Sequence, residues 1–165
     1  DYNLGNYINS VTGRDMLLWN GGCHVHGKFS VEAIVKLKAE HPEAVVMAHL
    51  ECKAPVLAVA DVKGSTATML DYAKEHKETK EYIIATEAGI LHELQRCCPD
   101  VTFYPVPPEV SEGGVGCSCN ECEYMKKNTL LKIYNTLRYE LPEVTVDESI
   151  AKDAVKPIER MLELS

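Results

Sequence analysis

The sequence predicts an α/β domain, a three-layer αβα sandwich with a mostly parallel sheet. Apolar strand-like segments alternate with amphipathic helix-like segments, which is typical of parallel sheets covered by helices. The continuous apolar run from Ala44 to Ala48 has the pattern of a strand buried on both faces. Ser30 and the pair Ser65-Thr66 stand before helical patterns and are expected to cap helices. The length of 165 residues is enough for one principal core.

The remaining elements follow in chain order. Strands are expected at Met16–Trp19, Ala44–Ala48, Tyr82–Ala85, Val101–Tyr104 and Val144–Val146. Helices are expected from Ser30 to about His41, at Pro55–Ala60, from Ser65 to about His76, at Gly89–Cys98, from Tyr124 to before Pro142, and after Asp147. Residues 61–64 are expected to connect two of these helices. The last helix is expected to bury a stripe formed by Ile150, Ala154, Ile158, Met161 and Leu162.

Composition and charge narrow the class of protein. The formal net charge is -8, and Lys and Arg are interleaved with acidic residues, which argues against a nucleic-acid partner. Apolar runs fall short of the ~20 residues of a membrane span, so no membrane partner is expected. Seven cysteines without a secretory signal indicate the cytoplasm and thiols used as ligands. Because the first residue is Asp1 rather than Met, we expect the chain to begin within a longer protein.

Polar side chains gather after the predicted strands. Cys23 and His26 follow the first strand, His49 and Glu51 follow the second, Ser65 and Thr66 open a helix, and Thr86 and Glu87 follow the Tyr82 strand. Ligands of parallel α/β sheets bind beyond the carboxyl ends of the strands. We therefore expect these residues at one edge of the sheet.

The cysteines have more than one interpretation. Cys23 follows Gly21-Gly22, and glycines let backbone approach an iron–sulfur cluster, although a small buried thiol is the alternative. Cys119-x-x-Cys122 has a spacing shared by zinc sites, iron–sulfur sites and redox pairs. A four-thiolate zinc site is disfavoured because the other close pair, Cys97-Cys98, lies at a helix end, where adjacent residues point apart. We interpret Cys52, Cys97 and Cys98 as buried or incidental thiols.

Two further patterns favour binding of an anionic small molecule. His49-Leu50-Glu51 places an imidazole and a carboxylate on one side of an extended segment, where they can hold a substrate carboxylate and move a proton. Ser65 and Thr66 offer hydroxyls and free N–H groups at a helix start, which suits an anion. Plain N-capping by Ser65 remains the alternative at that position.

The order of short sequence blocks resembles the quinolinate synthase family of bacterial NAD biosynthesis along the whole chain. The blocks are Asp1-Tyr2-Asn3-Leu4-Gly5-Asn6-Tyr7, Thr12-Gly13, Trp19 to His26, His49-x-Glu51, Ala60-Asp61, Gly64-Ser65-Thr66, Thr86-Glu87-x-Gly89, Cys122-x-Tyr124-Met125, Asn128-Thr129-Leu130 and Arg160-Met161-Leu162. The family usually has Pro where this chain has Leu50 and Glu123, and each change frees a backbone N–H.

The resemblance implies three similar α/β domains, each giving one cysteine to a [4Fe-4S] cluster. Residues 1–22 would end the second domain, and residues 23–165 would form the third, with the cysteine loop 105–122 and the C-terminal helices. Cys23 matches the second cluster ligand and Cys122 the third, whereas Cys117 and Cys119 match neither. A segment with two of three ligands is expected to be inactive alone.

The resemblance also implies the reaction and its residues. Iminoaspartate condenses with dihydroxyacetone phosphate to quinolinate, with loss of phosphate and water, and an open iron of the cluster acts as Lewis acid. An aspartate oxidase that supplies iminoaspartate would be a partner. His49, Glu51 and Thr66 match the family's substrate-binding positions, and Ser65 beside them and His26 lining the cavity are also expected to bind substrate. Glu51 and His49 are the expected catalytic residues, with Glu51 in acid–base work. The competing hypothesis is a non-catalytic zinc-binding or thiol-redox module.

Overall fold

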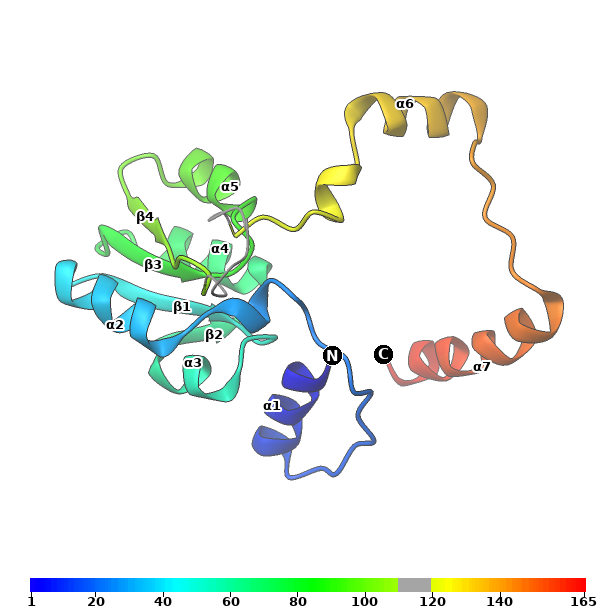
Figure 1. The fold of residues 1–165 in the computed structure, drawn as a ribbon, viewed down its shortest axis with the longest axis horizontal. Helices are drawn as coiled ribbons and strands as arrows, with labels where there is room; N and C mark the ends of the chain where they lie inside the picture. The colour runs from blue at the N-terminus through cyan, green and yellow to red at the C-terminus, as the bar shows by residue number, and fades with distance from the viewer. Residues whose placement is uncertain (110–119) are drawn as a thin grey trace. The chain divides into compact units, whose positions relative to one another are not determined.

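A computed structural model describes residues 1–109 and 120–165. These residues divide into two compact units, 1–123 and 124–165, which are treated separately below (Figure 1). The first unit holds the sheet and the candidate site. Cys117 and Cys119, and most of the predicted 105–122 loop, lie outside the described residues.

The first unit contains a four-stranded, all-parallel sheet. Its strands are β1 (Val45–His49), β2 (Val62–Gly64), β3 (Glu81–Ala85) and β4 (Thr102–Pro105), in the order β2-β1-β3-β4. In the central strand β1, Met47 pairs with Ile84 of β3 on one side and with Val62 of β2 on the other. The predicted parallel sheet is therefore confirmed.

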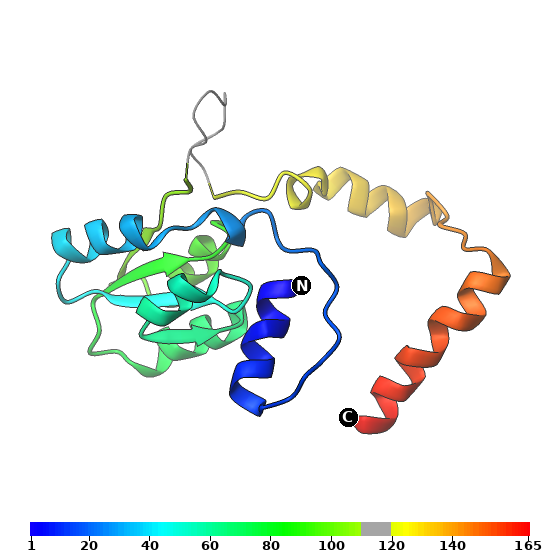
Figure 2. The same ribbon diagram turned by 60° about the horizontal axis from the view of Figure 1, so that its bottom comes forward.

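Helices cover both faces of this sheet, as Figure 1 and Figure 2 show. Side chains alternate between the two faces of a strand, so neighbouring residues of β1 and β3 enter different cores. One core joins Val46, Ala48, Ile83 and Ala85 to α2 (Val31–Glu40) and α3 (Ala54–Val59). The other joins Met47, Tyr82 and Ile84 to α4 (Thr66–Glu75) and α5 (Ile90–Cys97). These layers form the predicted αβα sandwich.

The predicted helix caps of this unit are confirmed. Ser30 accepts a hydrogen bond from the Ala33 N–H at the start of α2, and Ser65 accepts one from the Thr68 N–H at the start of α4. Each cap satisfies one backbone donor that the first helical turn leaves without a partner. The caps fix where α2 and α4 begin relative to the strands.

The N-terminal helix α1 (Tyr2–Thr12) is fastened to the glycine turn that precedes Cys23. The Asp1 side chain caps α1 through the Leu4 N–H and also accepts a hydrogen bond from the Cys23 N–H at 2.7 Å. The Tyr2 N–H donates to the Gly21 carbonyl at 2.8 Å. Residues 1 and 2 thus hold the backbone at Cys23.

Two predicted strands are wrong, and one strand was not predicted. Residues 16–19 are irregular, with Leu17 fully exposed and Trp19 84% exposed, because no strand lies beside them to pair with. Residues 144–146 are also irregular. Residues 62–64, expected only to connect two helices, form β2 by pairing with β1. A run of this length is too short to recognise as a strand from its own sequence.

The second unit consists of a 3-10 helix (Met125–Lys127), α6 (Leu130–Tyr139) and α7 (Glu148–Leu164). Thr129 and Asp147 cap the two α-helices, as predicted for Asp147. The predicted buried stripe of α7 is wrong, since Ile150 is 61% exposed and Met161 60%. An apolar stripe is buried only where another element packs on it. No helix in the described parts of the chain has the length and apolar character needed to cross a membrane.

Candidate functional site

The candidate site lies at the carboxyl edge of the sheet. His49 ends β1, Thr86 follows β3, and the register places Gly64, the last residue of β2, beside His49. Ser65 and Thr66 follow Gly64 directly, so the predicted gathering of polar residues at one edge of the sheet is confirmed. Ser65 and Thr66 are exposed.

His26 is held by two side chains from different elements. It begins a 3-10 helix (His26–Lys28) and is only 6% exposed. Its Nδ1 lies 3.0 Å from Glu51 Oε2, and its Nε2 lies 2.9 Å from the Oγ1 of Thr86, which is 1% exposed. Both ring nitrogens are therefore engaged within the protein.

His49 packs face to face on His26. The two ring centroids are 4.3 Å apart, with 13° between the planes. The Glu51 N–H donates to His49 Nδ1 at 3.3 Å, and Glu51 Oε2 lies 3.8 Å from the same nitrogen. The segment after β1 therefore folds back so that its carboxylate reaches both imidazoles.

Burial sets the charge state of this pair. Desolvation, and then the neighbouring His49, lower the pKa of His26, while Glu51 opposes them. Desolvation likewise lowers the pKa of His49. We assign both rings as neutral at pH 7. Because the Glu51 carboxylate only accepts, His26 Nδ1–H donates to it, and the Thr86 hydroxyl donates to Nε2.

Cys23 lies close to His26 and Glu51. The Sγ of Cys23 and ligand atoms of His26 and Glu51 lie within 4.8 Å of one another. Cys23 is half-buried, and its N–H is bound by Asp1. The glycine turn therefore does not leave this N–H free to bond a cluster sulfur, although it does bring the thiol beside the imidazole and the carboxylate.

Cys122 packs on the same apolar core as Cys23. Both side chains contact the apolar core that includes Val25, Phe29 and Val106. Two thiols that are far apart in the sequence are therefore brought to one side of the sheet. Soft thiolate donors suit an iron–sulfur group, so the residues present fit two of the three ligands that the resemblance implies.

The other described cysteines are not members of this donor set, although Cys52 belongs to the apolar core on which Cys23 and Cys122 pack. Cys52 is fully buried, its Sγ–H donates to the Ala85 carbonyl at 3.5 Å, and burial raises its pKa to about 12. This thiol stays protonated, which confirms the prediction of a buried structural cysteine. Cys97 and Cys98 are half-buried at the end of α5.

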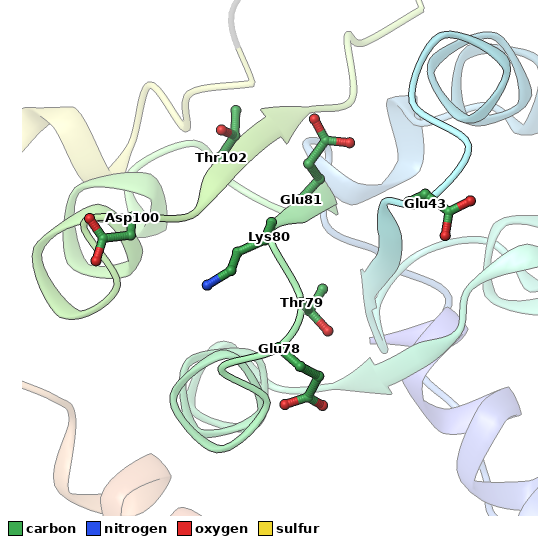
Figure 3. A pocket seen from close by; sticks show the side chains of 7 residues that line it. All are labelled: Glu43, Glu78, Thr79, Lys80, Glu81, Asp100 and Thr102. Atoms are coloured by element: carbon green, nitrogen blue, oxygen red, sulfur yellow. The ribbon is translucent and has the colours of Figure 1, made fainter.

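A cavity at the opposite edge of the sheet is distinct from this site. It measures about 520 Å³ and opens around the amino ends of the strands (Figure 3). Its lining is mostly acidic and hydroxyl-bearing: Glu43, Glu78, Thr79, Lys80, Glu81, Asp100 and Thr102. None of the residues predicted to act in catalysis or metal binding lines it.

The sequence predicted Thr86 and Glu87 at the carboxyl edge of the sheet but gave them no role. In the structure Thr86 bonds His26 and Glu87 bonds the Cys122 backbone. The only sequence signal was their position after a buried strand. The role of Asp1 at Cys23 had no sequence signal, because the helix that Asp1 caps, α1, was not predicted either.

Fold and site together define an α/β domain that gathers thiols, imidazoles and a carboxylate beyond the carboxyl ends of a parallel sheet. Residues 1–163 match the family described as quinolinate synthetase A protein, and the chain belongs to that family. The predicted resemblance is thereby confirmed over the whole chain.

Curated relatives named quinolinate synthase extend the comparison. The chain is 47% identical to that of Microcystis aeruginosa (strain NIES-843 / IAM M-2473) over 165 residues, which is all of this chain and 50% of the relative. It is 47% identical to that of Nostoc punctiforme, covering 49% of it, and 46% identical to that of Chloroherpeton thalassium, covering 50%. The chain thus spans about half the length of these relatives.

Proposed function

We propose that this chain is part of a quinolinate synthase that condenses iminoaspartate with dihydroxyacetone phosphate. The products are quinolinate, one phosphate and two waters. The observation that carries this proposal is the family match along 1–163, together with the grouping of Cys23, His26 and Glu51 at the sheet edge. An aspartate oxidase is the proposed source of iminoaspartate, and the cytoplasm the proposed location.

The proposed cofactor is a [4Fe-4S] cluster. Cys23 and Cys122 would hold it, with a third thiolate supplied by a part of the protein outside this chain. When bound with three thiolates, it would supply an open iron as a Lewis acid for substrate oxygen or nitrogen. The shared packing of the two thiols on one apolar core supports this assignment.

Glu51 is the proposed acid–base residue. Its Oε2 accepts the His26 Nδ1–H, and this hydrogen bond holds the carboxylate in one orientation beside the two imidazoles. Side-chain exposure of 27% leaves it reachable by a small molecule. It would take up protons from carbon or nitrogen during condensation and return them to departing hydroxyl groups.

The two imidazoles and the α4 start complete the proposed substrate site. His49 Nε2–H, with Nδ1 occupied by the Glu51 N–H, is the donor we assign to a substrate carboxylate. Ser65 already accepts the Thr68 N–H, so the anion contact that we propose there uses the Ser65 hydroxyl proton and the exposed Thr66. His26 would line this proposed substrate site.

The competing proposal, a non-catalytic zinc or thiol-redox module, also has one supporting observation. Cys23, His26 and Glu51 are three donor types that bind a single zinc ion, and their ligand atoms lie within 4.8 Å. However, His26 uses both ring nitrogens in hydrogen bonds to protein side chains. A zinc ligand at His26 would first have to give one of these up.

The test is an anaerobic assay of the full-length protein with reconstituted cluster, in which iminoaspartate is generated from oxaloacetate and ammonia. Quinolinate and phosphate should appear in equal amounts, and omission of dihydroxyacetone phosphate should abolish both. Cluster-loaded protein that makes no quinolinate under these conditions would refute the proposal.

A further inference from the structure

The carboxylate of Glu87 bridges two backbone segments. Its Oε2 accepts the Gly89 N–H at 2.7 Å, and its Oε1 accepts the Cys122 N–H at 3.2 Å. Glu87 lies two residues beyond the end of β3, a strand at the centre of the sheet. The bridge therefore links Cys122 to the rigid part of the fold. Hydrogen bonds from N–H groups to a carboxylate are stronger than those between neutral groups.

A second set of contacts fastens the same segment. The Ala88 N–H donates to the Asn120 carbonyl at 3.0 Å, and the Asn120 side-chain amide donates to the Val106 carbonyl. Asn120 is 5% exposed, so these bonds are shielded from water. The backbone just before Cys122 is thus paired with the loop that carries Glu87.

The spacing of Glu87 and Gly89 has a steric reason. A Cβ added at Gly89 would lie 2.6 Å from Glu87 Oε2, closer than real Cβ atoms approach an oxygen. A methyl group at Gly89 would therefore displace the carboxylate from its present position on the Gly89 N–H. The block Thr86-Glu87-x-Gly89 thus contains a contact to which the proposed reaction gives no role.

We propose that Glu87 is a positioning residue that holds the backbone of Cys122 in place for metal binding, on the apolar core that it shares with Cys23; this rests on the proposed function. Cys23 is anchored separately, through Asp1. Each of the two cysteines therefore has its own carboxylate bonded to its backbone N–H, and the two carboxylates come from different parts of the first unit. Loss of Glu87 should release Cys122 and leave Cys23 in position.

Glu87→Gln tests this selectively. A glutamine side chain has one oxygen to accept one N–H, and its amide group would face the other N–H. Gly89→Ala tests the same contact without removing charge, because the new methyl displaces the carboxylate. Glu93→Gln is the matched control, since Glu93 is a glutamate of α5 whose side chain is 46% exposed and pairs with Arg96.

The first readout is the rate of alkylation of each cysteine in the full-length, metal-free protein, followed by peptide mass spectrometry. At Cys122 the rate should rise by about tenfold in Glu87→Gln and in Gly89→Ala, the scale expected for a lost charge-assisted hydrogen bond. The rate at Cys23 should stay unchanged, and Glu93→Gln should resemble the parent at both cysteines.

The second readout is iron retained against a chelator after anaerobic reconstitution, which should fall in both loop variants. Circular dichroism before each measurement confirms that a variant is folded. Parent-like alkylation at Cys122 in folded Glu87→Gln and Gly89→Ala would overturn the proposal, as would an equal rise at Cys23. A parent protein that binds no iron would overturn the proposed function instead, because the alkylation experiment needs no metal.

Discussion

Replacing Thr86 with Val removes the hydroxyl that donates to His26 Nε2 and leaves the side-chain shape nearly unchanged. Thr86 is 1% exposed and His26 6%, so water cannot take the place of the lost partner without opening the site. A buried acceptor left without a partner costs about 1–3 kcal/mol. We expect the free energy of unfolding of the sheet unit to fall by that amount.

For a unit of this size, each kcal/mol corresponds to a shift of roughly 4 °C in the unfolding midpoint. Thr86→Val should therefore lower the midpoint by about 4–12 °C in thermal unfolding of the chain followed by circular dichroism. Thr102→Val, at an exposed strand position, is the control and should stay near the parent. A midpoint for Thr86→Val equal to that of Thr102→Val would refute the proposed hydrogen bond and the neutral His26 assigned from it.

Three further predictions concern the rest of the site. Glu51→Gln in the full-length protein should lower turnover by about 10²–10⁴-fold at unchanged iron content; near-parent turnover would remove Glu51 from acid–base work. Cys122→Ser should lose the cluster while Cys97→Ser keeps it, measured as iron and sulfide per chain; the reverse result would contradict the ligand assignment. Because burial lowers the pKa of His26 and His49 below 6.5, the folded site binds fewer protons than the unfolded chain. Stability should therefore be full above pH 6.5 and decline as the pH falls toward the lowered values, and stability that rises on acidification would contradict this.

The elements that local sequence predicts well are those with local causes. Ser30 and Ser65 predict the starts of their helices because a capping side chain bonds a backbone N–H only three residues further along the chain. The buried run ending at His49 is recognisable because a strand covered on both faces has no polar positions. By contrast, the apolar run 16–19 has the same local pattern but no neighbouring strand, and it is irregular. The sequence of a four-residue segment does not determine whether another strand lies beside it to pair with.

The site was predictable as a location but not as a set of contacts. The carboxyl ends of parallel strands meet at one edge of the sheet, and this rule alone predicts that His26, His49 and Glu51 lie at that edge. The bond between Thr86 and His26 joins residues 60 positions apart, and its existence depends on the packing of the 3-10 helix against β3. Similarly, only the fold shows that Glu87 reaches the Cys122 backbone.

The apolar surfaces of the second unit also follow from a non-local cause. Leu130 of α6 is 88% exposed and Leu162 of α7 is 65% exposed, although both helices have the expected amphipathic pattern. The amphipathic pattern predicts which face of a helix is apolar, but it does not identify the element that would pack on that face. The predicted boundary between residues 22 and 23 and the assignment of three similar domains stay predictions.

The most direct test of the central claim is anaerobic reconstitution of the full-length protein with iron and sulfide, followed by its visible spectrum and metal content. We predict a brown protein with about four iron and four sulfide per chain, and loss of both in Cys23→Ser and in Cys122→Ser. A colourless protein that takes up one zinc ion and no iron–sulfur cluster would contradict the assignment and support the zinc-binding alternative.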